Sequence, residues 1–501
     1  MFFSINFLNL SLTILSGLLV GISYQPWGLG FLSFIGFVPL IRVWLISTSK
    51  KNLLYGYIFG FTYNLTSNYW IGSNSGAEPI VVISSLIFAT LYLALFWSLP
   101  GYIIGLLNKN SQVVYSLPFL IVILEWIRSF GPLGFSWGNL ALTQVEYLPL
   151  LQFNDIFGPY FSTFIILSVN IAFYFVLFDI SKRLFVLAAI VVFFIVFLFI
   201  GSLRINSFLP TDEFMNVSII QPNLDPNKKW DYSTRIQTFN IMDSLYNEAL
   251  NLSPDIILFP ETALPTYLTL DKKIRRKFQD KVDKSKIPIL IGTVDRSIDS
   301  TGEKVFYNSA MFMSPNTKYE IYAKMHLVPF AEYDLVPKIL HPLIKLNLNI
   351  DRGTFKGGKI YKTFEWKNII FSDLICYESS LPRYAREFSK RGAKILMIQA
   401  NDGWLGMSSG PYQHFSLAIL RAIENRLPIV RSGNTGISGI ILPSGKVQIK
   451  KELNTQAVFM GKVPIYSKKS FYSQYGDFFA VISFVTFMFI GPIKCSKKEY
   501  L

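Results

Sequence analysis

The chain has 501 residues, of which 51% are hydrophobic and only 16% are charged. Because a typical soluble protein has about 25% charged residues, this composition excludes an ordinary soluble protein and indicates that a bilayer covers much of the apolar surface. The net charge is +15, but no recognisable nucleic-acid-binding module accompanies it. Attraction to anionic lipid headgroups explains the charge more simply.

Apolar runs recur along the first 200 residues and once near the C-terminus. Eight of them are long enough to cross a bilayer, which takes about 20 helical residues: 6–24, 29–46, 53–72, 79–106, 113–130, 159–180, 184–202 and 478–493. The first is too long, and too closely followed by others, to be a cleaved signal peptide. The sequence predicts a membrane domain with seven transmembrane helices at 1–204, a polar domain at 205–472, and an eighth helix with a tail at 473–501.

Basic residues mark every second connection between these runs: Lys50, Lys51, Lys109, Lys182, Arg183, Lys494, Lys497 and Lys498. Short cytoplasmic loops carry an excess of Lys and Arg, so these loops and both termini are expected in the cytoplasm. The segment 205–472 is then expected outside the cytoplasmic membrane. The two cysteines, Cys376 and Cys495, would lie on opposite sides and could not pair within one chain. Cys376 is therefore expected to be a free thiol.

The segment 205–472 alternates apolar, strand-like runs with charged helical stretches. Strands are expected at 215–221, 255–260, 287–293, 305–313, 368–375, 393–400 and 428–431, and helices at 232–250, 271–284, 380–391 and 411–425. Such alternation predicts an α/β domain in which helices cover a sheet.

Three residues that could take part in catalysis stand at or near the ends of predicted buried strands. Glu261 ends the run "DIILFPETALP", Cys376 ends "NIIFSDLICYESS", and Lys324 lies in "YEIYAKMHLVPFAEY". A thiol, a carboxylate that takes its proton, and an ammonium that stabilises an oxyanion would together support acyl transfer. Taken singly, each has a plainer interpretation: a small buried hydrophobe for the cysteine, a helix cap for the glutamate, and a solvated charge for the lysine.

The residues flanking these three shift the interpretation, because the segment resembles the nitrilase, or carbon–nitrogen hydrolase, superfamily. The resemblance extends over "FPETALP", "YNSA", "YAKMHLVPFAEY", "CYES", "NDGWLG", "QHFSLAILRAIENR" and "RSGNTGISG". With about eight membrane spans added, the whole chain resembles the apolipoprotein N-acyltransferase family. The resemblance implies a multi-span α-helical membrane bundle joined to an extracytoplasmic α/β domain with the nitrilase-type αββα sandwich, the catalytic domain at 205–472.

The resemblance also implies roles for single residues. Glu261 would be the general base, Lys324 the oxyanion-stabilising cation and Cys376 the nucleophile. Supporting roles fall on Glu332 and Glu378, which would shape the site and support Lys324, on Tyr377 directly after the nucleophile, on Trp230 in a substrate-entry loop, and on Asn308 in the pocket. Ala331 departs from the glycine more common in "PFGEY", and we expect a slight change of loop geometry there.

The activity implied by the resemblance is the last step of bacterial lipoprotein maturation. An acyl chain would pass from the sn-1 position of a phospholipid, typically phosphatidylethanolamine, to a Cys376 thioester. It would then pass to the α-amine of the diacylglyceryl-modified N-terminal cysteine of an apolipoprotein. No cofactor, metal or nucleic acid is expected. The place would be the bacterial inner membrane, with the catalytic domain on the periplasmic side.

Two features near the lipid have open interpretations. Trp137, in "EWIRSFGPLGFSW", is either an interfacial anchor or a wall of the lipid-entry cleft. The apolar stretch 333–350 is either an arm that dips into lipid or a plain buried segment. Glu125 lies within a span, and pairing with Arg128 three residues along the helix explains it most simply.

Two other functions compete with acyl transfer to lipoproteins. A membrane-tethered amidase or nitrilase for small amides would share the three catalytic residues, but it has no need of eight spans. A transporter or channel with a sensor domain is disfavoured because few charges lie within the spans. The three histidines, His326, His341 and His414, are too scattered to predict a metal site by spacing, and we expect a structural role for His326.

Overall fold

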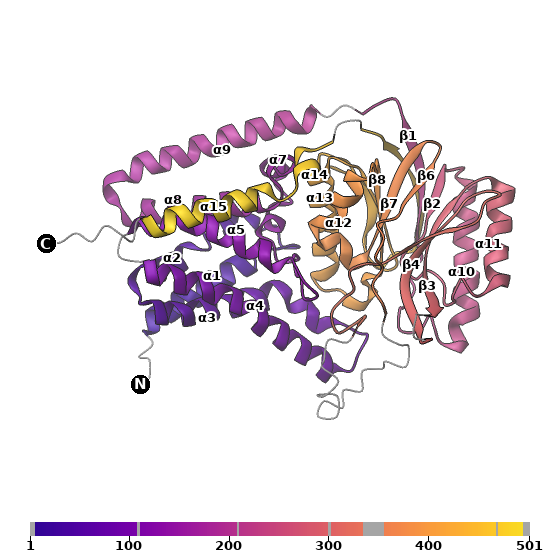
Figure 1. The fold of residues 1–501 in the computed structure, drawn as a ribbon, viewed down its shortest axis with the longest axis horizontal. Coiled ribbons are helices and arrows are strands. Elements are labelled where there is room, and N and C mark those ends of the chain that lie inside the picture. The colour runs from indigo at the N-terminus through magenta and orange to yellow at the C-terminus, as the bar shows by residue number, and fades with distance from the viewer. Residues whose placement is uncertain are drawn as a thin grey trace. The chain divides into compact units, whose positions relative to one another are not determined.

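The computed structural model describes residues 6–107, 111–207, 210–298, 302–333, 355–466 and 469–493. The chain divides into two compact units (Figure 1). One comprises Met1–Gly72, Val82–Ser207 and Tyr475–Leu501, and the other Ser73–Val81 and Phe208–Gln474. Residues 334–350 of the expected apolar arm, His341 and Cys495 lie outside the described residues.

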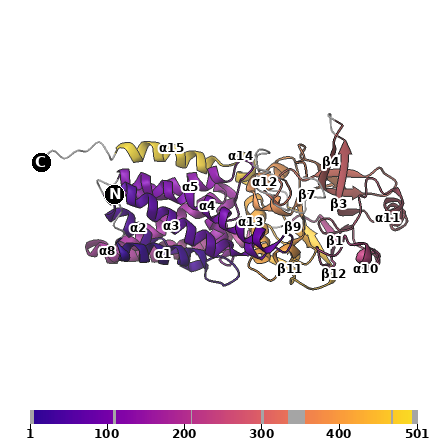
Figure 2. The same ribbon diagram turned by 90° about the horizontal axis from the view of Figure 1, so that it is seen from below.

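The first unit is helical. Its longer helices are α1 (Phe7–Gly21), α2 (Val38–Ile46), α3 (Ser49–Asn68), α4 (Pro79–Leu107), α5 (Leu117–Arg128), α8 (Tyr160–Phe178), α9 (Arg183–Asn206) and α15 (Phe478–Ile493), with the single turns α6 (Leu148–Leu151) and α7 (Asn154–Phe157). Helices α1, α2 and α3 pack against one another, and α5 contacts both α8 and α15 (Figure 2). A bundle of this kind is what the apolar runs predict.

Three of the described helices are long and apolar enough to cross a membrane. They are Pro79–Leu107, Tyr160–Phe178 and Ile180–Asn206. The runs at Phe7–Gly21, Gly30–Ile46 and Phe478–Phe489 form shorter apolar helices, and the second of these is divided into a 3₁₀ turn (Gly30–Phe34) and α2. The count of eight spans and the orientation of the termini therefore remain predictions.

Two buried charged side chains of α5 hold the loop that follows this helix. Glu125 and Arg128 lie 3.9 Å apart, so the expected ion pair forms, although loosely. The Arg128 guanidinium donates to the carbonyl oxygen of Gly138 at 2.8 Å, and Glu125 accepts from the Leu140 amide at 2.9 Å. Both side chains thus help to pair the backbone groups of this loop in an apolar surrounding.

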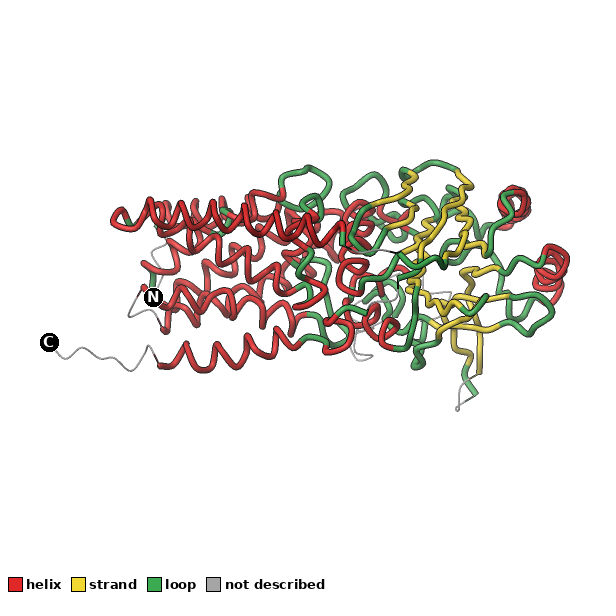
Figure 3. Tube along the Cα trace, turned by 90° about the horizontal axis from the view of Figure 1, so that it is seen from above, coloured by secondary structure: helices red, strands yellow, loops and turns green. Residues whose placement is uncertain are grey.

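The second unit contains all the described strands, and Figure 3 shows them in yellow. They form two six-stranded sheets, ordered β12-β1-β2-β3-β4-β5 and β11-β10-β9-β8-β7-β6. The bounds are β1 (Phe214–Gln221), β2 (Ile256–Leu258), β3 (Ile289–Ile298), β4 (Lys304–Met313), β5 (Glu320–Ala323), β6 (Thr363–Trp366), β7 (Ile369–Ile375), β8 (Ile395–Ala400), β9 (Ile429–Gly433), β10 (Ser438–Ile441), β11 (Val447–Lys451) and β12 (Ala457–Pro464). Strands β1, β2 and β3 run parallel, as do β7, β8 and β9.

The sheets face each other and helices cover their outer faces. Helices α10 (Tyr232–Asn251) and α11 (Lys272–Ser285) pack on the first sheet, where the rings of Tyr246 and Phe278 stack. Helices α12 (Pro382–Lys390) and α13 (Gly410–Asn425) pack on the second. Between the sheets, the side chain of Gln399 in β8 donates to the Phe259 carbonyl oxygen at 2.8 Å. This αββα order confirms the predicted fold class.

Candidate active site

Cys376 lies at the junction of β7 and a one-turn 3₁₀ helix, Cys376–Ser380. Its φ is 51°, a left-handed conformation that costs a residue with a side chain roughly 1–2 kcal/mol. Such a residue persists only where its surroundings hold it. The thiol is free and half-buried, so the strained turn places a sulfur atom at the end of the parallel strands.

The carboxylate of Glu378 anchors one side of this turn. Its Oε2 accepts from the Ile375 amide at 2.9 Å. Its Oε1 accepts from the Tyr322 hydroxyl at 2.9 Å and from the amides of Met325 at 2.6 Å and His326 at 3.2 Å. Burial raises the pKa of Glu378 to about 7, against the opposing effect of these donors. Glu378 therefore fastens the end of β7 to the segment that carries Lys324.

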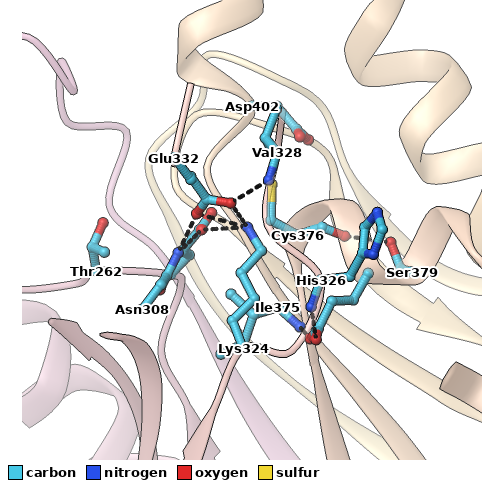
Figure 4. A network of polar contacts seen from close by, with 12 residues as sticks. Thr262, Asn308, Lys324, His326, Val328, Glu332, Ile375, Cys376, Ser379 and Asp402 are labelled. Atoms are coloured by element: carbon cyan, nitrogen blue, oxygen red, sulfur yellow. Dashed lines mark hydrogen bonds and ion pairs between the residues drawn. The ribbon is translucent and has the colours of Figure 1, made fainter. Parts of the chain in front are cut away.

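Lys324 follows β5 directly, and its ammonium lies among polar side chains from three segments (Figure 4). The Nζ atom is 2.8 Å from both carboxylate oxygens of Glu332 and 3.8 Å from Oε1 of Glu261. The amide of Asn308, in β4, donates to Glu261 at 2.7 Å and to Glu332 at 2.9 Å. The Val328 amide donates to the second oxygen of Glu332 at 2.7 Å. One buried cation and two carboxylates thus share a single network.

The charges around Cys376 set its protonation state and that of Lys324. Burial alone would lower the pKa of Lys324, but Glu332 and Glu261 outweigh it and the pKa is raised. Burial raises the pKa of the Cys376 thiol well above its usual value; Glu261 adds to the rise, and Lys324 opposes it. At neutral pH the resting site therefore contains a protonated thiol and a charged ammonium.

Glu261 stands three residues after the end of β2, on a turn that a buried lysine holds. Thr262 has a φ of 45°, and the Nζ of Lys229 donates to its carbonyl oxygen at 2.6 Å and to its hydroxyl at 3.0 Å. The neighbouring Trp230 ring lies 6.2 Å from that of Tyr267. The loop that carries Trp230 is thus tied to the turn that carries Glu261.

On the other side of Cys376, three buried residues that the sequence did not single out form a second network. His414 Nδ1 lies 2.6 Å from Oδ1 of Asp402, and the Arg431 guanidinium donates to Oδ2 at 2.6 Å. His414 Nε2 lies 3.1 Å from the Cys376 carbonyl oxygen and 3.0 Å from Ser379 Oγ. The partners are 12 to 38 residues apart in sequence, so spacing along the chain gave no signal of the cluster.

The charges of this second network are set by burial and by Arg431. Although burial opposes ionisation, Arg431 and His414 lower the pKa of Asp402 to about 2. Burial and Arg431 lower the pKa of His414. Potential metal-binding atoms of Cys376, Asp402 and His414 do gather within 4.8 Å. However, both oxygens of Asp402 are engaged and a guanidinium lies beside them, which disfavours a cation at this place.

The remaining residues singled out in the sequence have different surroundings. Tyr377 stacks its ring on His326, with centroids 5.7 Å apart. Trp137 belongs to the helical unit, where its ring lies 4.6 Å from that of Trp70; its role in lipid entry remains a prediction. In the loop that carries Glu332, the left-handed φ of 62° falls on Phe330 and not on Ala331. The methyl group of Ala331 therefore meets no backbone penalty.

Comparison with known proteins agrees with this architecture. Residues 216–466 match the family model described as carbon-nitrogen hydrolase, and residues 16–172 match the one described as apolipoprotein N-acyltransferase N-terminal domain. The fold and these two matches therefore define an acyltransferase with a carbon–nitrogen hydrolase domain joined to a helical N-terminal domain.

The relatives extend over nearly the whole chain. An apolipoprotein N-acyltransferase of Geobacter metallireducens is 31% identical over 94% of this chain and 92% of its own. One of Treponema denticola is 26% identical over 95% and 94%. The chain belongs to the apolipoprotein N-acyltransferase family. Among solved structures, Saccharomyces cerevisiae Nit3 of the nitrilase superfamily aligns with a TM-score of 0.37 and 16% identity, over 50% of this chain and 90% of that chain.

Proposed function

We propose that this enzyme transfers an acyl chain from the sn-1 position of a phospholipid to the α-amine of the diacylglyceryl-modified N-terminal cysteine of apolipoproteins, through a thioester on Cys376. The observation that carries the proposal is the placement of one buried ammonium, that of Lys324, between Glu332 and Glu261 and within electrostatic reach of the Cys376 thiol. This arrangement supplies a nucleophile, a base and a cation for the developing oxyanion.

In the first half-reaction, Glu261 accepts the proton of the Cys376 thiol. The thiolate attacks the ester carbonyl carbon, and the negative charge that develops on the carbonyl oxygen is stabilised by the Lys324 ammonium. The intermediate collapses by breaking the bond to the glycerol oxygen, which takes the proton from Glu261. A lysophospholipid leaves, and a thioester remains on Cys376.

In the second half-reaction, the α-amine of the apolipoprotein attacks the thioester carbonyl carbon. Glu261 accepts a proton from the amine, and the sulfur leaves as the amide bond forms. The sulfur then takes the proton back, which restores the free thiol. Because an amide is more stable than a thioester, the step needs no ATP. The same carboxylate serves as base and acid in both directions.

The supporting residues fit defined parts of this cycle. Glu332 and Asn308 hold Lys324 and Glu261 in one network, Glu378 holds the turn of Cys376, and Tyr377 would line the site beside it. Trp230 and Trp137 would contact the lipid chains on entry. As substrates we propose phosphatidylethanolamine as the acyl donor and diacylated apolipoproteins as acceptors. Both substrates are anchored in a membrane by lipid chains, and we propose that the catalytic domain lies on the periplasmic side of the inner membrane with both termini in the cytoplasm.

Intact-protein mass spectrometry after incubation with phosphatidylethanolamine tests the proposal, with Cys376→Ala as the control. We expect a mass increase of one acyl chain that hydroxylamine removes, that the variant lacks, and that a diacylated lipopeptide discharges. Phosphatidylglycerol in a parallel incubation tests the headgroup. If no adduct forms while small amides are hydrolysed, the enzyme is an amidase and the acyl-transfer proposal is wrong.

A further inference from the structure

We propose that His414, held by Asp402 and Arg431, is a positioning residue that fixes the left-handed turn of Cys376 and thereby aims its thiol. The inference rests on the proposed role of Cys376 as the nucleophile, and it extends the functional network to the side of the turn opposite Glu378. Three observations carry it: the strained turn, the contacts of its carbonyl group, and the burial of the network.

The turn needs a constraint on both sides. A residue with a side chain at φ 51° returns to an extended or right-handed conformation unless its neighbours prevent it. Glu378 fixes the amide that precedes Cys376 by accepting from Ile375. On the other side of the turn, the carbonyl group of Cys376 also needs a partner. Its oxygen accepts from the Ser379 hydroxyl at 2.8 Å and lies 3.1 Å from His414 Nε2.

Both nitrogens of the His414 ring are engaged in this arrangement. In the tautomer that we assign, Nε2 carries the ring proton and donates to the Cys376 carbonyl oxygen, beside Ser379. Nδ1 then accepts from the Arg431 guanidinium at 3.1 Å, next to Asp402 Oδ1. The ring therefore has the two-sided anchorage of a positioning group, and Glu261 remains the carboxylate that serves as base. Arg431 makes the anchorage rigid, because it binds Asp402 and also donates to the Ile437 carbonyl oxygen at 3.0 Å.

The network is closed to solvent. Arg431 is fully buried, and His414 and Asp402 are 1% and 2% exposed. Apolar side chains of similar volume often stabilise a fold as well as buried charged groups do, or better. We therefore infer that this network fixes a geometry. Here the network fixes the position of the carbonyl group of Cys376, the proposed nucleophile.

Two variants of the full-length enzyme separate positioning from mere packing. His414→Phe preserves a ring but removes both polar contacts. His414→Gln places an amide nitrogen close to the position of Nε2, from which it can donate to the Cys376 carbonyl oxygen. Because a misplacement of about 1 Å can cost roughly 10²-fold in rate, we expect the rate of thioester formation from phosphatidylethanolamine to fall about 10²-fold in His414→Phe. The KM for the lipid should stay within about threefold. His414→Gln should recover at least about a tenth of the normal rate.

A second pair of variants keeps the test open if His414→Phe does not fold. Ser379→Ala removes only the hydroxyl that donates to the Cys376 carbonyl oxygen, and we expect about a tenfold loss of rate. Ser389→Ala is the matched control, because this buried serine of α12 has a hydroxyl without a hydrogen-bond partner among the described residues. It should leave the rate unchanged. Thioester formation within about threefold of normal in both Ser379→Ala and the folded His414 variants would overturn the proposal.

The rate at which iodoacetamide alkylates Cys376 distinguishes this inference from the proposed function. This rate measures how accessible and reactive the Cys376 thiol is when no lipid is present. If the unaltered enzyme forms no thioester, the proposed function fails, but an alkylation rate at least about tenfold lower in His414→Phe would still support positioning. If thioester forms normally and neither rate changes in the variants, only the role of His414 is wrong.

Discussion

The ammonium of Lys324 lies 2.8 Å from the carboxylate of Glu332 and 3.8 Å from that of Glu261, so two glutamates share one buried cation. The lysine side chain is 1% exposed, whereas Glu332 retains 13%. A buried ammonium with two carboxylates remains charged, which the rise in its pKa reflects. In the proposed reaction the two glutamates have different tasks: Glu332, at the shorter distance, holds the cation, and Glu261 is the base.

Replacing Glu332 with Gln should separate these tasks. The variant leaves Lys324 with one carboxylate 3.8 Å away, and breaking a buried ion pair costs about 3–5 kcal/mol. We expect thioester formation to fall about 10²-fold and the midpoint of thermal unfolding to drop. Glu320→Gln is the control, because Glu320 forms an ion pair with Lys362 in which both side chains are well exposed. Equal effects of the two variants would show that Glu332 contributes only a surface charge.

Glu378 should be intolerant of the same conservative change. Glu378→Gln places an amide nitrogen against the amide of either Ile375 or Met325, both of which donate to the carboxylate. Each buried donor left unpaired costs about 1–3 kcal/mol. We expect a clear fall in the thermal midpoint and loss of the acyl-enzyme, measured by differential scanning fluorimetry and mass spectrometry. Glu365→Gln, at an exposed position of β6, should change neither; a Glu378→Gln enzyme as stable as that control contradicts the anchoring role.

Much of this architecture is predictable from local pattern. The central parallel strands are mostly apolar, and the expected strands at 215–221, 368–375 and 393–400 lie close to β1, β7 and β8. The outer strands β5, β6, β10, β11 and β12 were not predicted. Strand β11, for example, is largely exposed and reads "VQIKK", so it has no apolar run. Pairing with a neighbour defines such strands, and a sequence does not display pairing.

The candidate site likewise has a part that the sequence predicts and a part that it does not. Glu261, Lys324 and Cys376 stand in motifs that resemble a known family, and the contacts around Lys324 lie where that resemblance leads one to look. Asp402 and His414 also stand in quoted motifs, but their chemistry depends on a contact with a backbone carbonyl oxygen of Cys376. Backbone acceptors have no sequence signature. The histidine therefore had no reason to stand out until the turn of the nucleophile was visible.

Asp373 gives the protein a stability that depends on pH. It is fully buried in β7, and no side chain of the described part of the chain donates to either carboxyl oxygen. Burial raises its pKa well above the usual value, Glu378 and Glu261 add to the rise, and the Leu374 amide opposes it only in part. An unfolded aspartic acid titrates near pH 4. Below that pH both states bind the proton; above it the unfolded state releases the proton and folding stability falls.

Asp373→Asn should remove this dependence. We expect the variant to unfold at a higher temperature than the unaltered enzyme at pH 7. The difference should shrink to its low-pH limit below about pH 4, where Asp373 is protonated in both the folded and the unfolded state. Thermal unfolding in detergent at several pH values measures it. Asp283→Asn is a control of opposite sign, because the Asn316 amide and Gln279 lower the pKa of Asp283. A difference between Asp373→Asn and the unaltered enzyme that does not grow with pH would contradict the assignment.

The segment Ser73–Val81 should matter for catalysis although it connects two helices of the other unit. It belongs to the compact unit of the catalytic domain, where the Ser75 amide donates to the Trp404 carbonyl oxygen at 2.8 Å. Asn227, in the loop that carries Trp230, donates to the Ser75 hydroxyl at 3.0 Å. A Cβ atom added at Gly76 would lie 3.0 Å from the Trp404 ring.

Gly76→Val should therefore displace Trp404, which stands two residues after the Asp402 that holds His414. We expect thioester formation to fall about tenfold while the thermal midpoint of the enzyme changes little, because a small shift at the site costs more in rate than in stability. Ser75→Ala keeps the backbone contact and loses only an exposed hydrogen bond, so it should retain nearly full activity. Normal thioester formation in Gly76→Val would mean that this segment rests on the catalytic domain without influencing the alignment of Cys376.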